Sequence, residues 1–372
     1  MSSDGGQPGR PRAVTAHLQV IGAVRGAAAL LVAFLHTRQI TWIGIQAAWE
    51  QFGVSRNLVV WLGYLTFPVV WGSVGVPIFF VVSGYCIHRS HAVRLAGDSA
   101  YRLGSRRYLQ RRFFRIYPVL LAALVLTFVC DWVAMRAAPG IQDLGTHSAI
   151  VFLGNVASVQ GWLVPPFGSN GPLWTLSIEV QLYLFYIFLF SFRRRWGIPR
   201  TALLAVAINA VSICITRGLF TSYLVSWCLG AYLAEPGQRL SVLPKARRLF
   251  AAGLLLLAAL GVFFTRWQDA FFFILSACAF ALVLSCLLQA DLAPTPTLRV
   301  FDKLGEFSYS LYSVHRPLAV LAGAVILRGV RSQFIAVPLL VLGLVVFMAY
   351  VFHLVVERPW LKRSGVSGGS GA

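Results

Sequence analysis

Residues 19–37 read QVIGAVRGAAALLVAFLHT, an apolar run interrupted by one arginine and followed at its end by a histidine. About 20 mainly apolar residues are enough for a helix to cross a bilayer. Comparable stretches recur along the chain, and the predicted spans are 19–37, 69–87, 117–136, 173–192, 202–216, 221–235, 249–265, 269–290, 304–327 and 333–356. The sequence therefore predicts an all-α fold, a polytopic membrane bundle of about ten transmembrane helices.

The composition of the chain agrees with a membrane protein. Of 372 residues, 58% are hydrophobic and only 12% are charged, whereas a soluble domain carries about twice that charged fraction. The net charge of +20 would suggest nucleic-acid binding in a soluble protein, but no soluble domain is present to provide it. The six cysteines lie in apolar segments without metal-ligand spacing, so we expect no metal site. No glycine-rich nucleotide loop is visible either, and we expect no tightly bound cofactor.

The positions of the basic residues predict the orientation in the membrane. With both termini in the cytoplasm, the inner tails and loops hold 23 of the 32 Lys and Arg, and the outer loops hold seven. Basic residues favour the cytoplasmic side, so this distribution predicts that both termini are cytoplasmic. Two long outer loops, 38–68 and 137–172, contain apolar stretches of their own. We interpret them as interfacial or re-entrant pieces that cover the outer mouth of a cavity.

The polar ends of the chain set the expected domain boundaries. Residues 1–18 are rich in Gly, Pro and Ser and lack the apolar core of a signal peptide, which predicts a disordered cytoplasmic tail. Residues 19–361 form the membrane domain, and 362–372 form a flexible cytoplasmic tail. No internal repeat of the kind found in many transporters is visible.

Two polar residues stand out in the first predicted span. Arg25 and His36 are 11 residues apart, about 16 Å along a helix and on nearly the same face. A charged residue within a span usually faces a protein interior or a water-filled cavity. Each residue taken alone could instead sit at a membrane surface, with Arg25 reaching the inner side and His36 capping the outer end. Together on one face they favour a polar cavity.

An arginine cluster precedes the third predicted span. Arg112 and Arg115 share one face of a helix, and Arg111 lies one turn before Arg115. Guanidinium groups at a membrane entrance suit a multiply phosphorylated ligand, because each can bind phosphate oxygens through two hydrogen bonds. The alternatives are a topological anchor and a contact with anionic lipid headgroups.

Two further polar groups lie in later spans. Glu179 should lie just inside the membrane at the start of the fourth span, with Tyr183 one turn further on. This carboxylate either holds a structural arginine or orients a catalytic histidine. The ninth span carries a polar stripe that ends at His315 and Arg316.

Six sequence elements, in order, resemble the acyltransferase-3 family of bacterial membrane acyltransferases. They are Arg25-Gly26-Ala27 with Leu35-His36, Gly75 to Tyr85, Arg112 to Arg115, Leu173 to Tyr183, Phe307 to His315, and Glu357-Arg358-Pro359. The resemblance covers residues 19–361, with Tyr85 where Phe is usual and Thr175 where Ser is usual. It implies transfer of an acyl group, usually acetyl, from a coenzyme A thioester to a hydroxyl. It also makes Arg112 and Arg115 donor-binding residues and His36 the functional histidine.

The expected site combines these signals. We expect His36 to be the catalytic base and Glu179 to orient it; an acyl-histidine intermediate, or His315 as the base, are the alternatives. Acyl-coenzyme A is the expected donor, and acetyl-coenzyme A is the form that we expect. Its predicted ligands are Arg25, Arg111, Arg112 and Arg115. The predicted cavity-lining residues are Ser83, Trp174, Ser177, Tyr183, Tyr309 and His315.

The predicted function is that of an enzyme, an O-acyltransferase for groups other than aminoacyl groups, in the bacterial cytoplasmic membrane. The acceptor expected from the resemblance is a hydroxyl of a cell-surface glycan or glycolipid. The alternatives are acylation of a macrolide or other natural product, transport of a solute or a lipid-linked glycan, and a non-catalytic scaffold. A transporter needs two compartments to show activity, whereas an acyltransferase can work in detergent.

Overall fold

The computed structural model describes residues 12–55, 57–141, 144–215, 220–237, 239–265, 268–290 and 295–363. Within these ranges the chain is almost entirely helical and forms no strand, only isolated bridges between residue pairs. The all-α prediction is therefore confirmed. The main helices are α1 (Arg12–Thr41), α2 (Ile45–Phe52), α3 (Leu58–Leu65), α4 (Gly75–Gly97), α5 (Ser105–Ala137), α6 (Ala149–Val156), α7 (Trp174–Ile215), α8 (Leu224–Leu233), α9 (Lys245–Val262), α10 (Phe273–Leu287), α11 (Pro296–Glu306), α12 (Ser308–Leu327), α13 (Ala336–Phe352) and α14 (Arg358–Arg363).

Six helical stretches in the described ranges are long and apolar enough to cross a membrane. They are His17–Thr41, Leu58–Gly97, Ser105–Ala137, Gly171–Ile215, Ser308–Leu327 and Ala336–Leu361. Each of the ten predicted segments overlaps a helix, but α8 and α10 are shorter apolar helices. The count of ten spans therefore stays a prediction.

Helix α7 contains a sharp bend that explains part of this difference. Gly197 has a positive φ of 78°, outside the helical region, and Pro199 follows it. A positive φ is readily adopted only by glycine, and proline removes a helical hydrogen bond. The bend divides α7 into two arms, which correspond to the predicted segments 173–192 and 202–216.

The prediction of one continuous span over 304–327 is wrong at its start. The chain leaves helical geometry at Phe307, so α11 and α12 are separate helices. Helix α11 lies directly against α1, where glycines permit backbone contact. A Cβ added to Gly26 would lie 2.1 Å from the carbonyl oxygen of Phe301, and one on Gly305 would lie 2.0 Å from that of Gly22. Small residues of this kind are typical of close helix crossings in membranes.

A second close crossing fixes α4 against α8. A Cβ on Gly84 would lie 2.0 Å from the Trp227 carbonyl oxygen, and one on Gly230 would lie 1.8 Å from that of Val81. These distances leave no room for any side chain at either glycine. The crossing holds Ser83, the residue next to Gly84, in the wall of the cavity described below.

Helix α12 is the most enclosed of the candidate spans, and it packs against α1, α5 and α13. Its buried positions are mostly Ala, Gly, Ser, Leu and Val, with His315 fully buried among them. Small side chains allow neighbouring helices to approach closely, so dispersion contacts stabilise the packing.

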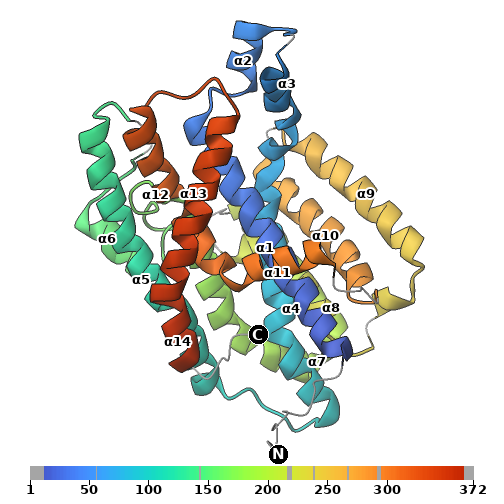
Figure 1. Cartoon of the computed structure of the whole chain (residues 1–372). Coiled ribbons are helices and arrows are strands. Elements are labelled where there is room, and N and C mark those ends of the chain that lie inside the picture. Colours follow the sequence, from blue (N-terminus) through green and yellow to red (C-terminus); the bar gives the residue numbers. More distant parts are fainter. Residues whose placement is uncertain are drawn as a thin grey trace, which may run out of the picture.

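The two long loops predicted to be interfacial form short helices. Helices α2 and α3 of the first loop lie at one end of the bundle, and α6 of the second loop lies beside α5 (Figure 1). Exposed apolar side chains include Trp49 and Leu58 on the first loop and Ile150 on the second. The start of α1 and helix α14 lie at the opposite end (Figure 1). Helix α1 begins at Arg12, so it extends into the predicted N-terminal tail. Residues 1–11 and 364–372 lie outside the described residues.

Candidate active site

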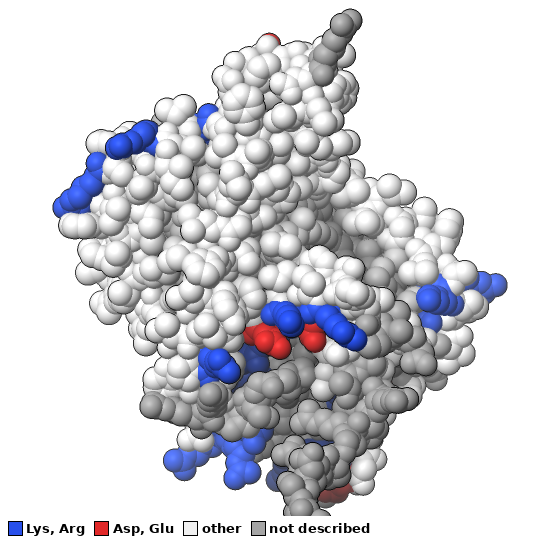
Figure 2. Space-filling view, in the orientation of Figure 1, with Lys and Arg blue, Asp and Glu red and all other residues white. Residues whose placement is uncertain are grey.

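A cavity of about 1060 Å³ opens among α1, α4, α5, α7, α12 and the end of α13. At the α14 end it is lined by residues such as His17, Arg94 and Arg358, and its far end reaches Thr175 and Tyr312. On the face shown in Figure 2, the charged atoms gather mostly in the lower half, near the α14 end. A polar cavity that reaches from this charged end into the bundle can admit a charged molecule.

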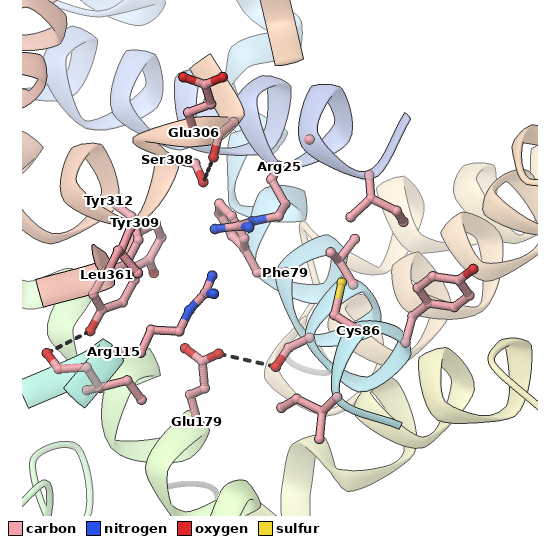
Figure 3. A pocket seen from close by; sticks show the side chains of 18 of the residues that line it. Arg25, Phe79, Cys86, Arg115, Glu179, Glu306, Ser308, Tyr309, Tyr312 and Leu361 are labelled. Atoms are coloured by element: carbon pink, nitrogen blue, oxygen red, sulfur yellow. Dashed lines mark hydrogen bonds between the residues drawn. The ribbon is translucent and has the colours of Figure 1, made fainter. Parts of the chain in front are cut away.

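Three arginines project into the interior of this cavity. Arg25 comes from α1, and Arg112 and Arg115 come from the first half of α5. In Figure 3, the guanidinium groups of Arg25 and Arg115 and the carboxylate of Glu179 point toward one another. Among the described residues, no salt bridge is formed by Arg25, Arg112 or Arg115. These cations are therefore available to an anionic ligand.

Aromatic side chains hold Arg112 in place. Its guanidinium carbon lies 5.5 Å from the ring centre of Tyr108 and 5.6 Å from that of Tyr183. Contacts at this range between a guanidinium group and an aromatic ring are attractive and orient the cation. The Nε atom of Arg112 is buried without a hydrogen-bond partner in the described structure. Arg112 is thus positioned before any ligand binds, with donor capacity still unused.

The predicted ligand Arg111 lies elsewhere. Its side chain is exposed and does not line the cavity. One residue along a helix rotates a side chain by about 100°, so Arg111 points away from the direction of Arg112. This exposed position is the one expected for an arginine that anchors the topology of the chain or contacts lipid headgroups.

The rim of the cavity includes charged residues to which the sequence reasoning gave no role. Arg89, Arg94 and Arg358 line it at the α14 end together with Asp302 and Glu306. Burial and the neighbouring Glu306 raise the pKa of Asp302 above its ordinary value. In all, six arginines and four carboxylates line the cavity. The signal that could have found the rim arginines was present, since Arg89 and Arg94 follow the second predicted span and Arg358 follows the last.

Glu179 is held by groups other than His36. Its Oε1 accepts hydrogen bonds from the Ser83 hydroxyl, at 3.2 Å, and from the Tyr183 hydroxyl. The expected pairing of Glu179 with His36 is therefore corrected, because the structure pairs His36 with His315. The position of Glu179 among Arg25, Arg112 and Arg115 makes it part of the arginine-lined cavity.

The two histidines form a direct pair. Nδ1 of His36 and Nε2 of His315 are 2.8 Å apart, and the rings are stacked with their centroids 5.0 Å apart. Nδ1 of His315 lies 2.8 Å from the carbonyl oxygen of Tyr312 and 3.2 Å from that of Leu311. His315 is fully buried, whereas His36 keeps partial exposure. Helix α12 thus provides a fixed partner for the histidine of α1.

Tyr312 lies next to both the cavity and His315. Its ring lines the far end of the cavity together with Phe79, 5.3 Å away between ring centres. The same ring lies 5.7 Å from that of His315. The Tyr312 hydroxyl accepts a hydrogen bond from Thr175 at 2.9 Å. The histidine pair therefore adjoins the far end of the cavity without lining it.

The remaining predicted cavity residues divide into two groups. Ser83, Tyr183 and Tyr309 line the cavity. Trp174 and Ser177 do not: the Trp174 ring packs against Tyr223, at 5.4 Å between centroids, and the Ser177 hydroxyl accepts a hydrogen bond from Gln181. Both side chains lie on α7 at positions that do not line the cavity.

Glu357 is a cavity residue to which the sequence reasoning gave no role. It lies in a short π-helical turn, His353–Glu357, and accepts hydrogen bonds from Ser310, at 2.6 Å, and from His353, at 2.8 Å. Such turns often occur at functional sites. Here the turn directs a carboxylate into the cavity wall and ties the end of α13 to α12.

A separate ionic cluster lies away from the cavity. The Glu235 carboxylate accepts two hydrogen bonds from Arg193, at 2.5 and 2.6 Å, and one contact of 2.8 Å from Nε2 of His88. These hydrogen bonds join α4, α7 and the end of α8, and the cluster lines a second, smaller cavity of about 310 Å³.

Comparisons with known proteins show the family of the chain. The profile of the acyltransferase-3 family, described as an acyltransferase domain, matches residues 19–358, and the chain belongs to this family. It is 26% identical to the acyltransferase MdmB of Streptomyces mycarofaciens over 400 residues, covering 95% of this chain and 94% of the relative. It is also 26% identical to BcsY of Komagataeibacter xylinus, named as a membrane-bound transacylase, over 323 residues, covering 78% and 76%. No solved structure matches.

The protein is therefore a membrane enzyme that transfers acyl groups other than aminoacyl groups. In the described part of the chain, no group of three His, Cys, Asp or Glu side chains could hold a metal ion. Arginine and histidine side chains supply the polar groups of the site.

Proposed function

We propose that this enzyme transfers an acetyl group from acetyl-coenzyme A to a hydroxyl of a cell-surface glycan or glycolipid. It acts as a multi-pass protein of the bacterial cytoplasmic membrane, with both termini in the cytoplasm. The observation that carries the proposal is the cavity with Arg25, Arg112 and Arg115, none of which forms a salt bridge in the described structure. It opens at the end of the bundle that the distribution of basic residues assigns to the cytoplasm.

Coenzyme A fits the charge of this cavity. Its diphosphate and 3′-phosphate carry about four negative charges near neutral pH. Each guanidinium group can bind phosphate oxygens through two charge-assisted hydrogen bonds. The six lining arginines outnumber the four lining carboxylates, so a phosphorylated ligand is favoured. The long, thin pantetheine arm can then extend along the cavity toward Tyr312.

The histidine pair supplies the base for the transfer step. With the thioester at the Tyr312 end of the cavity, the acceptor hydroxyl approaches the acyl carbon from the side of His36. Neutral imidazole can remove the hydroxyl proton as the carbon–oxygen bond forms, a contribution of typically 10²- to 10⁴-fold. His36 lies about 16 Å further along α1 than Arg25, and its partial exposure suits an acceptor outside the cytoplasm.

The proposal is tested with purified protein in detergent. Calorimetry with coenzyme A measures donor binding, and release of free thiol from acetyl-coenzyme A measures turnover. Mass spectrometry of surface glycans and small metabolites, from cells with and without the enzyme, identifies the acceptor by the lost acyl mass. The proposal requires donor binding and consumption without a second compartment. Absence of both would refute it and favour a transport function.

A further inference from the structure

The hydrogen bonds around His315 determine which of its nitrogens carries the proton. Nδ1 faces two backbone carbonyl oxygens, those of Tyr312 at 2.8 Å and Leu311 at 3.2 Å. A carbonyl oxygen only accepts hydrogen bonds, so Nδ1 must carry hydrogen. In a neutral imidazole the other nitrogen is then an acceptor. Nε2 of His315 therefore presents a lone pair toward His36.

The contact with His315 also determines the tautomer of His36, whose ring forms a further hydrogen bond with the backbone of Val32. Its Nδ1 lies 2.8 Å from the acceptor Nε2 of His315, so this nitrogen must donate. Nε2 of His36 is consequently the unprotonated nitrogen, the form that a general base requires. The opposite arrangement would place a lone pair of His315 against two carbonyl oxygens, which is repulsive.

Burial distinguishes the two histidines further. His315 is fully buried, with one nitrogen engaged by the α12 backbone and the other by His36. It has no free nitrogen to offer a substrate. His36 keeps partial exposure and an unprotonated Nε2. The two residues therefore have different tasks, although both are histidines in contact.

We propose that His315 is a positioning residue: it fixes His36 in the tautomer with a free Nε2 and stabilises the imidazolium that forms there. This rests on the proposed function. The acceptor oxygen bonds to the thioester carbonyl carbon, the carbon–sulfur bond breaks, and the hydroxyl proton passes to Nε2 of His36. It then passes to the departing coenzyme A thiolate, which restores neutral His36. While His36 is charged, its Nδ1–H bond to His315 is charge-assisted and stronger than in the resting state.

Three substitutions of His315 test the proposal. Gln can place an amide oxygen near the position of Nε2 and accept from His36. Asn can still donate to the helix carbonyl oxygens, but it is too short to reach His36. Leu removes both functions with a similar volume. Donor affinity is measured by calorimetry with coenzyme A, and turnover by thiol release from acetyl-coenzyme A.

We expect His315→Leu and His315→Asn to lose turnover by about 100-fold, within the range of general-base contributions, with donor affinity unchanged. His315→Gln should retain turnover within about tenfold of wild type. A general packing role would instead weaken the Gln and Asn variants alike. Turnover that is unaffected in His315→Leu, or a folded, donor-binding His315→Gln that falls 100-fold, overturns the proposal.

Failure of this proposal can be separated from failure of the proposed function. A wild-type protein that neither binds coenzyme A nor consumes its acetyl thioester refutes both. An active wild type with an active His315→Leu variant refutes only the role of His315. If the Leu and Asn variants do not fold, the Gln variant alone decides, because the proposal requires it to remain active.

Discussion

Replacing Arg115 by alanine should weaken donor binding more than any change at the outer surface of α5. Arg115 projects into the cavity beside Glu179 (Figure 3) and forms no salt bridge in the described structure. No described carboxylate lies within salt-bridge distance of its guanidinium group, so its hydrogen-bond donors can bind a phosphate. Loss of one charge-assisted contact costs about 1.5–3 kcal/mol, which is roughly 10- to 150-fold in affinity.

Comparison with Arg112 refines this expectation. The guanidinium group of Arg112 lies against Tyr108 and Tyr183, so Arg112→Ala removes a positioned cation and should fall in the same range. Arg112→Lys keeps the charge but loses the planar fork that binds two phosphate oxygens, so an intermediate loss is expected. The gradation from Lys to Ala would separate specific phosphate binding from a general effect of charge.

Isothermal titration with coenzyme A, at one fixed salt concentration, is the assay. Arg106→Ala is the matched control, because Arg106 lies on the same helix, is exposed and does not line the cavity. Arg106→Ala should bind within about twofold of wild type. Unchanged affinity in both Arg112→Ala and Arg115→Ala would refute their assignment as donor ligands. The arginine cluster would then serve only to orient the chain in the membrane. Equal losses in all three variants would indicate only a non-specific electrostatic attraction.

Three other expectations address orientation, helix packing and the Glu235 cluster. In a cysteine-free background, Arg194→Cys should be shielded in intact cells from an impermeant thiol reagent, whereas Arg328→Cys should be labelled. The reverse pattern would show that the orientation in the membrane is the opposite one. Gly84→Ala should destabilise the protein by at least about 2 kcal/mol, because its Cβ would lie 2.0 Å from the Trp227 carbonyl oxygen. Thermal melting in detergent measures the effect, and the control Gly97→Ala should melt like the wild type. Glu235→Gln should lower the melting temperature in detergent, because it removes the carboxylate that accepts two hydrogen bonds from Arg193 and one from His88. Unchanged melting would contradict a role of this cluster in holding the helices together.

The helical spacing in the sequence was sufficient to group residues on one helix. Arg112 and Arg115 are three residues apart and enter one cavity, and Arg25 enters it from α1. The same spacing failed for Arg111, because a one-turn relation to Arg115 does not show which side of the helix faces the interior. That choice depends on how α5 packs against its neighbours, and the periodicity of one helix does not contain this information.

Contacts between distant segments were beyond the reach of sequence reasoning. His36 and His315 are 279 residues apart, and no local pattern records their pairing. The search for a partner of His36 turned to Glu179 because a carboxylate is a common orienting group, whereas the structure supplies a second imidazole. The break at Phe307 was missed although polar residues surround it, among them Glu306, Ser308 and Ser310. Their local pattern does not show that α11 packs against α1 as a separate helix.

The arrangement of α1 and α12 explains how the donor and the base can be kept in register. Helix α1 carries both Arg25, in the cavity, and His36, in the histidine pair. Helix α12 carries both Tyr312, at the end of the cavity, and His315, about 4.5 Å further along the axis. The two helices pack directly on each other. Catalysis by proximity is sensitive to displacements of about 1 Å, and rigid packed helices hold such a geometry better than loops. Because each helix contributes to both parts of the site, a shift of either one would misplace the donor and the base together.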